Sequence, residues 1–361
     1  MGAKKKNAPD LGLFIIVLAL LTIGIVMVFS ASYYDTITND PFYYLKRQAA
    51  FAGIGLGALF VAMNVNYSRY RGITKLLLLM SFALLIGVLF MPAIKGVRRW
   101  YPLEFFNFQP SELTKFVVVL YMADRLSKKS ASLQHFIGDL STVLVVIGVQ
   151  AALILKEPDL GTAVAIVCTG VIILIIAGLR LRHLMALAVC GFALLGYAIF
   201  DEPYRINRLL GFMDPWADAA GTGYQVINSL YALGSGGLMG MGIGGSRQKL
   251  GFLPEHYTDF IFAVIGEELG FFGTLAVVVL FLLFAWRGYR IASRCSDLFG
   301  SLLAAGMTTM IVLQAMLNIG VVTGCLPVTG ISLPFISYGG SSLLLCLGMS
   351  GIILNISRYM E

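Results

Sequence analysis

The sequence is poor in charge and in metal-binding chemistry. Charged residues make up 12% of its 361 residues, about half the share of roughly 25% that is typical of soluble globular proteins. It contains 3 histidines, which lie far apart, and 5 cysteines with no C-x-x-C spacing. These shortages exclude a water-soluble surface, and they argue against a disulfide framework or a His/Cys metal site.

The chain is rich in long hydrophobic runs. Hydrophobic residues make up 58% of the chain, and they gather in blocks that reach the roughly 20 residues needed to cross a bilayer. We therefore predict an all-α integral membrane protein, a single polytopic domain over residues 1–361 with ten transmembrane helices. The expected spans are 11–31, 48–65, 74–92, 111–127, 138–155, 160–178, 183–200, 258–286, 299–323 and 337–356.

The distribution of basic residues predicts the orientation in the membrane. If the N-terminus, with Lys4, Lys5 and Lys6, is cytoplasmic, the inner segments hold 15 of the 26 Lys and Arg residues and the outer loops hold 10, with Lys115 inside a span. Because positive charge favours the cytoplasmic side, we expect both termini in the cytoplasm and a large outer loop at 201–257. The net charge of +7 then reflects topology, and we expect no nucleic-acid partner.

The long outer loop mixes apolar stretches with glycine. We expect short amphipathic helices there, separated by glycine turns. The run from Gly234 to Gly245 could offer backbone N–H groups to a phosphate, but tight turns explain it better. It lacks the preceding strand that a nucleotide-binding glycine motif needs.

Asp259 lies at the N-terminal end of the eighth expected span. Placing an ionisable acid beside an apolar span costs free energy, so its presence there indicates a functional site. The alternative is structural, because Thr258 and Asp259 are residue types that cap a helix N-terminus. The sequence leaves both interpretations open.

Two further acidic motifs lie in or beside spans. Glu112 and Lys115 are three residues apart at the start of the fourth span and share one helix face. Such a pair either orders the helix or marks a cavity, since a charged pair at membrane depth must face protein or water. For Glu267 and Glu268, inside the eighth span, we expect a hydrogen-bonded packing role.

An ordered set of motifs runs along the whole chain, at residues 26–32, 99–100, 108–115, 157–162, 223–225, 253–262, 266–270, 327–330 and 333–342. This set resembles the SEDS family (shape, elongation, division and sporulation), which includes FtsW, RodA and SpoVE. Residues 266–270 and 318–324 are more similar to the division and sporulation members than to RodA, whereas Tyr257 and Asn228 depart from the usual residues.

The resemblance implies a ten-span fold with both ends cytoplasmic. It also implies a peptidoglycan glycosyltransferase that polymerises lipid II at the outer face of the bacterial cytoplasmic membrane, with a class B penicillin-binding protein as partner. Asp259 falls on the proposed catalytic aspartate of the family. The alternatives are a lipid II flippase or another transporter, and a scaffold that only recruits the penicillin-binding protein.

The expected reaction needs one base and several cations. Asp259 would take the proton of the acceptor 4-hydroxyl, and the pyrophosphate leaving group needs positive charge rather than a proton. A divalent cation such as Mg²⁺ or Mn²⁺ could contribute, although no ligands for it are identified. The supporting ion pair is Glu112–Lys115, and the candidates for binding substrate or pyrophosphate are Arg99, Arg205, Arg208, Lys249, Ser337 and Tyr338.

Overall fold

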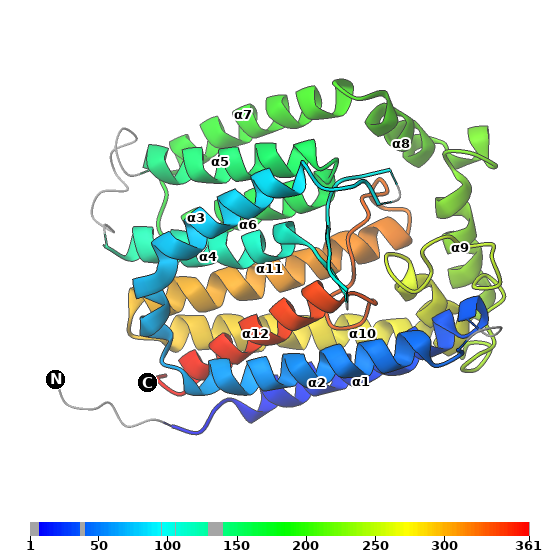
Figure 1. Cartoon of the computed structure of the whole chain (residues 1–361), viewed down its shortest axis with the longest axis horizontal. Coiled ribbons are helices and arrows are strands. Elements are labelled where there is room, and N and C mark those ends of the chain that lie inside the picture. Colours follow the sequence, from blue (N-terminus) through cyan, green and yellow to red (C-terminus); the bar gives the residue numbers. More distant parts are fainter. Residues whose placement is uncertain (1–6, 37–39, 95, 105, 129–139, 361) are drawn as a thin grey trace.

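A computed structural model describes residues 7–36, 40–94, 96–104, 106–128 and 140–360. Its long helices run side by side in one bundle (Figure 1), and each corresponds to one expected span. The positions at 138–139, where the fifth span was expected to begin, lie outside the described residues. The helices are α1 (Leu11–Ser32), α2 (Tyr43–Asn64), α3 (Tyr70–Val88), α4 (Pro110–Lys128), α5 (Ser141–Lys156), α6 (Leu160–Ile176), α7 (Leu181–Phe200), α10 (Ile261–Arg294), α11 (Leu298–Val322) and α12 (Gly340–Ser357).

Seven of the described helices are long and apolar enough to cross a membrane: α1, α2, α3 with its preceding turn, α7, α10, α11 and α12. Helices α5 and α6 are apolar but have only 16 and 17 residues, and α4 carries several charged residues. The chain is thus an all-α, multi-span membrane protein, and the count of ten remains a prediction. Lys4, Lys5 and Lys6, on which the predicted orientation partly rests, lie outside the described residues.

The eighth expected span, 258–286, differs from a single continuous helix. Helix α10 begins at Ile261 and is broken at Gly270, which has φ 68° and ψ −163°. A Cβ atom at Gly270 would lie 2.4 Å from the backbone nitrogen of Gly240, so both the positive φ and the close approach require glycine. The segment after Gly270 is long enough to cross a membrane by itself, and Asp259 lies outside the helix.

The loop 201–257 contains the short helices that the sequence predicts. They are α8 (Pro203–Met213), the 3₁₀ helix η4 (Pro215–Asp218) and α9 (Tyr224–Gly236). The turn that follows is hydrogen-bonded to the break in α10, because Met241 N donates to Glu267 O and Gly242 N donates to Glu268 O, each at 2.9 Å. Smaller elements elsewhere are η1 (Tyr34–Thr36), η2 (Tyr67–Arg69) and a hairpin of β1 (Tyr101–Pro102) with β2 (Asn107–Phe108).

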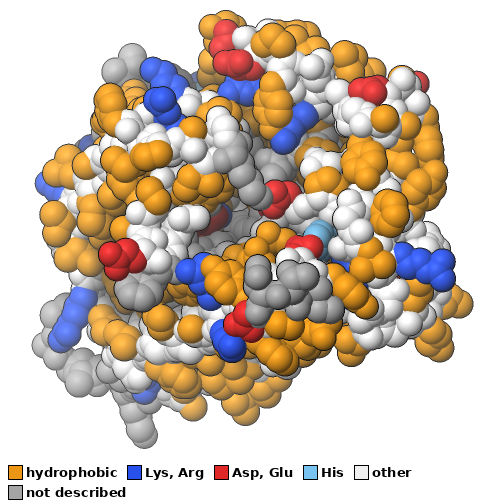
Figure 2. Space-filling model, turned by 45° about the vertical axis from the view of Figure 1, so that its right-hand side comes forward, with side chains coloured by type: hydrophobic (Ala, Val, Ile, Leu, Met, Phe, Trp, Pro, Cys, Tyr) orange, Lys and Arg blue, Asp and Glu red, His pale blue; other side chains and the backbone are white. Residues whose placement is uncertain are grey.

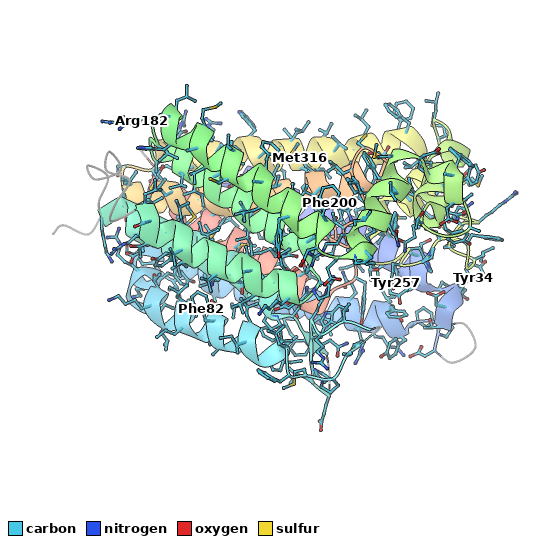
Figure 3. All side chains as sticks on the ribbon, turned by 90° about the horizontal axis from the view of Figure 1, so that it is seen from above. Tyr34, Phe82, Arg182, Phe200, Tyr257 and Met316 are labelled. Carbon is cyan, nitrogen blue, oxygen red and sulfur yellow. The ribbon has the colours of Figure 1, made fainter. Side chains whose placement is uncertain are left out.

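The bundle has two distinct ends and a buried centre. Helices α11 and α12 form the centre, whereas α7 buries only Ala198 and presents apolar side chains outward, as expected beside lipid. Asn7 N donates to Arg358 O at 3.0 Å, which brings the two described termini to one end. Figure 3 shows Arg182 at one end and Tyr34 and Tyr257 at the opposite end, where α8, α9 and the hairpin lie (Figure 1).

Candidate functional site

A cavity of about 860 Å³ lies at the end of the bundle that carries α8 and the hairpin. Its size is in the range of ligand-binding pockets, which is roughly 300–1,000 Å³. Figure 2 shows a hollow in one face of the molecule, with acidic and basic side chains at its rim and hydrophobic side chains over much of the surrounding surface. The lining comes from the start of α2, the hairpin and the start of α4, the α5–α6 connection, α8, residues 255–260, residues 328–332 and the start of α12.

Asp259 lines this cavity and does not cap a helix. The N-cap residue of α10 is Phe260, and no side chain caps that end. The backbone carbonyl of Asp259 accepts a hydrogen bond from Asn318 Nδ2 at 2.7 Å, but within the described part of the chain its carboxylate accepts none. The capping interpretation is therefore wrong, and the half-buried carboxylate is available to a ligand in the cavity.

The surroundings of Asp259 increase its basicity. Burial and, to a smaller extent, the nearby charge of Glu255 raise its pKa from 3.8 to about 6, against the opposing effect of Arg99. A carboxylate with a pKa near 6 is ionised at neutral pH and yet accepts a proton more readily than an ordinary aspartate. This combination suits a general base.

Ser337 and the backbone of Tyr338 hold the segment before Asp259 in place. Ser337 Oγ donates to Thr258 O at 2.6 Å and accepts from Leu333 N at 2.7 Å. Tyr338 N donates to Tyr257 O at 3.0 Å. Ser337 is buried and does not line the cavity, so its contacts are those of a positioning residue, whereas the ring of Tyr338 does line it.

Arg99 and Arg208 are cations of the cavity wall. Arg99 is anchored by donating to the backbone carbonyls of Glu157 and Pro158. Arg208 Nη1 donates to Val328 O at 2.9 Å, and its guanidinium lies 4.4 Å from the centre of the Tyr204 ring. Both influence the pKa of Asp259, so both lie within electrostatic reach of the carboxylate.

Gly330 separates Arg99 from Asp259. A Cβ atom at Gly330 would lie 3.5 Å from Asp259 Oδ2 and 4.0 Å from Arg99 Nη1. Its φ of +74° also disfavours other residues. Because Gly330 has no side chain, a ligand atom has room to approach both the carboxylate and the guanidinium.

The other two predicted cations are occupied by structural contacts. Arg205 lines the cavity but is 8% exposed, and it donates to Ala198 O at 2.6 Å and to Leu155 O at 3.0 Å. Lys249 does not line the cavity. Its Nζ lies 2.7 Å from Glu268 Oε1 in a fully buried ion pair, so the structure separates Lys249 from the other candidates.

The two glutamates of α10 have the predicted packing role. Glu268 accepts hydrogen bonds from Ser30 Oγ as well as from Lys249. Glu267 accepts from Ser246 Oγ and from the backbone N–H of Arg247. Together they fix the turn at 244–249 against α1 and α10.

Glu112 and Lys115 form the expected ion pair, with Lys115 Nζ 2.8 Å from Glu112 Oε1. Lys115 also donates to Gln314 Oε1 at 2.6 Å, and Gln314 donates to Ser332 O at 2.9 Å. Glu112 and Ser332 both line the cavity. The pair therefore orders α4 and supports the cavity wall, so both interpretations hold.

Two acidic residues near the site were not among the predicted site residues. Asp159 lines the cavity and caps α6 by accepting from Thr162 N at 3.0 Å. Glu157 is fully buried, and neither carboxylate oxygen has a hydrogen-bond partner among the described residues. Burial raises the pKa of Glu157 to about 9, which keeps it neutral at pH 7. Their shared motif, Glu157-Pro158-Asp159, was the available signal.

Tyr257, the departure from the family pattern, packs against Tyr44. The two hydroxyl oxygens lie 3.2 Å apart. Five acidic residues line the cavity: Glu112, Asp159, Glu202, Glu255 and Asp259. Even so, the described part of the chain holds no group of three or more His, Cys, Asp or Glu residues placed to hold a metal ion.

Comparison with known proteins identifies the family. A family model described as "Cell cycle protein", covering FtsW, RodA and SpoVE, matches residues 11–361. The chain belongs to this family. It is 46% identical to "Stage V sporulation protein E" of Bacillus subtilis (strain 168), over 98% of each chain. It is 40% identical to "Probable peptidoglycan glycosyltransferase FtsW" of Geobacter metallireducens, over 100% of this chain and 98% of that protein.

Solved structures of family members share the fold. A chain from work described as "Structural coordination of polymerization and crosslinking by a peptidoglycan synthase complex" has a TM-score of 0.81 and 32% identity, over 97% of this chain and 98% of that chain. The rod shape determining protein RodA of Thermus thermophilus has a TM-score of 0.72 and 29% identity, over 98% of this chain and 99% of that chain. The chain therefore has the RodA-like multi-span fold of a bacterial membrane protein.

Proposed function

We propose that this chain is a peptidoglycan glycosyltransferase that polymerises lipid II, with Asp259 as its general base. The observation that carries the proposal is the Asp259 carboxylate. It lines a cavity, accepts no hydrogen bond from the described residues and has a pKa raised to about 6. Family membership and the relatives described as peptidoglycan glycosyltransferases support the same reaction.

The reaction is a displacement with inversion at an anomeric carbon. The acceptor 4-hydroxyl gives its proton to the Asp259 carboxylate while its oxygen forms a bond to C1 of the donor sugar. The bond between C1 and the phosphate oxygen breaks, and undecaprenyl pyrophosphate leaves as an anion. Asp259 then releases the proton to water, which restores the base.

A single carboxylate suffices because the leaving group is already a stable anion. A glycoside hydrolase needs a second acid to protonate a sugar oxygen, whereas pyrophosphate needs only positive charge. Arg99 and Arg208 supply that charge at the cavity wall. Fixed cations that meet charge developing at the leaving group lower the barrier without reorganisation.

The same proposal covers topology and location. The ten long helices cross the bacterial cytoplasmic membrane, both termini are cytoplasmic, and the connection 201–257 lies outside. The cavity is then at the outer face, where lipid II is used. Arg182 at the opposite end of the bundle (Figure 3) agrees with the preference of positive charge for the cytoplasmic side.

A cross-linking enzyme is the proposed partner. The solved chain with a TM-score of 0.81 comes from a complex whose description joins polymerization to crosslinking. Because this chain covers 98% of that chain, we propose that it assembles with a class B penicillin-binding protein in the same way. The partner would cross-link the glycan as it leaves the cavity.

The test uses the full chain in vesicles with fluorescent lipid II, with and without its partner and with and without Mg²⁺ or Mn²⁺. We expect glycan chains to form with the wild type and not with a folded Asp259→Ala variant. Leaflet exchange of lipid II without chain growth would support a flippase instead. Full function of Asp259→Ala in cells would support a scaffold.

A further inference from the structure

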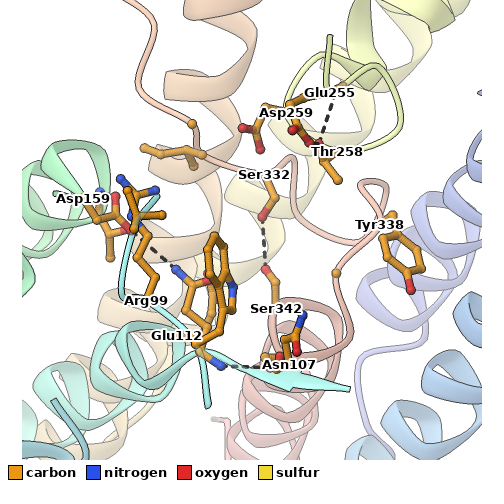
Figure 4. Close-up of a pocket in the computed structure, with 18 of the residues that line it drawn as sticks. Arg99, Asn107, Glu112, Asp159, Glu255, Thr258, Asp259, Ser332, Tyr338 and Ser342 are labelled. Atoms are coloured by element: carbon orange, nitrogen blue, oxygen red, sulfur yellow. Dashed lines mark hydrogen bonds between the residues drawn. The ribbon is translucent and has the colours of Figure 1, made fainter. Parts of the chain in front are cut away.

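The cavity has two chemically different sides. Arg99 and Arg208 lie close enough to each other and to Asp259 to interact electrostatically. Three tyrosines from other segments, Tyr44, Tyr257 and Tyr338, also line the cavity. Figure 4 shows Arg99 with Asp159 on one side of the close-up and Tyr338 on the other, with Asp259 between them in this view. The proposed function uses the carboxylate and the cations but leaves the tyrosines unexplained.

The three tyrosines form one preformed cluster. The ring centres of Tyr44 and Tyr257 lie 4.7 Å apart, those of Tyr44 and Tyr338 lie 4.9 Å apart, and those of Tyr257 and Tyr338 lie 6.0 Å apart. The rings come from α2, from the segment before Asp259 and from the last loop. Because the hydrogen bond from Tyr338 N to Tyr257 O joins the last two segments, the cluster is fixed relative to Asp259.

This cluster differs from ordinary core packing in its exposure. Tyr44, Tyr257 and Tyr338 are only half-buried and all face the cavity, whereas core aromatics such as Phe284 are fully buried. Tyrosine presents an apolar ring and a polar hydroxyl. A pyranose ring has the matching features, with apolar C–H faces and hydroxyl groups around its edge.

Arg47 lies beside the three tyrosines, but its contacts do not indicate a phosphate-binding role. The Arg47 guanidinium lies 4.9 Å from the centre of the Tyr43 ring, and Arg47 is hydrogen-bonded to Tyr338. It is therefore part of the aromatic cluster's framework. Arg99 and Arg208, by contrast, approach the Asp259 carboxylate closely enough to affect its pKa.

The geometry of an inverting displacement indicates which substrate binds on each side of the cavity. The attacking oxygen and the leaving oxygen must lie on opposite faces of the anomeric carbon. The pyrophosphate is drawn to Arg99 and Arg208, so the acceptor must approach from the side away from them. We infer that Tyr44, Tyr257 and Tyr338 form the subsite for the terminal sugar of the acceptor, and that the arginine side holds the pyrophosphate of the donor.

This assignment rests on the proposed function, and two modified substrates test it separately. Lipid II without its 4-hydroxyl can act only as donor. Lipid II with a methylene group in place of the anomeric oxygen can act only as acceptor, because its C1–C bond does not break. Mixed together, they give a single condensation product whose initial rate yields a KM for each substrate.

We expect Tyr44→Ala and Tyr338→Ala to raise the KM of the acceptor-only substrate about tenfold, which corresponds to the loss of one good contact. The KM of the donor-only substrate should change less than twofold, and this unchanged value also shows that the site is folded. Tyr44→Phe and Tyr338→Phe keep the ring and should recover most of the affinity. Arg208→Gln should raise the donor KM instead.

Two results would overturn the inference. If the tyrosine-to-alanine variants raise the donor KM rather than the acceptor KM, the two sides are reversed. If they change neither KM, the cluster is not a sugar subsite. Failure of the wild type to join the two substrates would overturn the proposed function itself, and the assignment with it.

Discussion

Two acids near the start of α10 have opposite surroundings. Glu268 is fully buried, and its carboxylate accepts hydrogen bonds from Ser30 Oγ, Lys249 Nζ and the backbone N–H of Ser246. Asp259 is half-buried at a cavity, and none of the described residues donates to its carboxylate. A satisfied buried acid stabilises a fold, whereas an unsatisfied one with a raised pKa marks chemistry.

The difference arises from where the chain stops being helical. Glu268 lies just before the break at Gly270, where the turn at 237–249 returns and supplies its partners. Asp259 precedes the first helical residue, Ile261, so its side chain is directed by loop geometry rather than by a helix face. The same residue class in one apolar stretch thus acquires a structural role at one position and a proposed catalytic role at the other.

The largest expected effect is on Asp259. Asp259→Asn keeps the size of the side chain and removes the base, so we expect the rate of glycan formation to fall by about 10²–10⁴-fold. Thermal unfolding in detergent should occur at or above the wild-type temperature, because no described hydrogen bond is lost and the raised pKa of Asp259 means that its charge destabilises the folded state. A parallel loss of thermal stability would show that Asp259 is structural.

Glu268→Gln should show the opposite pattern. Removing one charge leaves Lys249 buried without its counter-ion, which lowers the free energy of unfolding by about 3–5 kcal/mol. Activity per folded molecule should stay within about twofold of the wild type. The matched control is Glu268→Leu with Lys249→Met, which removes both charges and should recover much of the stability. Loss of activity in a fully stable Glu268→Gln protein would contradict this role.

Gly330→Ala should have an intermediate effect. The new methyl group would stand between Asp259 and Arg99, and the positive φ would cost about 1–2 kcal/mol. We expect kcat to fall about tenfold through misplacement of the reacting groups. Gly339→Ala is the control, because it lines the same cavity with an extended φ and its Cβ would meet Ser342 only at 3.8 Å. Equal losses in the two variants would count against a specific gap at Gly330.

The smallest expected effect is a shift in pH dependence. Below pH 6 the Asp259 carboxylate is protonated and cannot accept a proton, so kcat should fall about tenfold per pH unit. Glu255→Gln removes a charge that raises this pKa, so the acidic limb of the pH dependence of kcat should move to lower pH. If Glu255→Gln does not shift the acidic limb of the pH dependence of kcat, a group other than Asp259 is responsible for that limb.

The same pKa shift affects stability. Because the folded-state pKa of Asp259 lies above the ordinary value of 3.8, protonation of Asp259 favours the folded state. Its ionisation therefore costs stability as pH rises from about 4 to 6.

Much of the fold could be predicted because hydropathy varies strongly along the chain. Most of the helices match the expected spans to within about five residues, although α10 ends at Arg294 rather than at 286. The spacing of Glu112 and Lys115 on one helix face predicts their ion pair. The break at Gly270 could not be predicted, since a glycine in an apolar run fits a continuous helix equally well.

Part of the site depends on contacts between distant segments. The position of Lys249 in the outer loop predicts a cation of the cavity, yet the loop folds back and pairs it with Glu268, 19 residues away. Tyr44 and Tyr257 meet across 213 positions, and no local pattern indicates that contact. The sequence does indicate Asp259, because an acid at the edge of an apolar span is unusual whatever the tertiary structure.

The most direct test of the central claim compares Asp259→Asn with Glu268→Gln in one experiment. The measured quantity is the initial rate of glycan formation from lipid II, divided by the amount of folded protein. We predict that this rate is close to the wild-type rate for Glu268→Gln and at least about 10²-fold lower for Asp259→Asn. Near-wild-type synthesis by folded Asp259→Asn would contradict the assignment of Asp259 as the base.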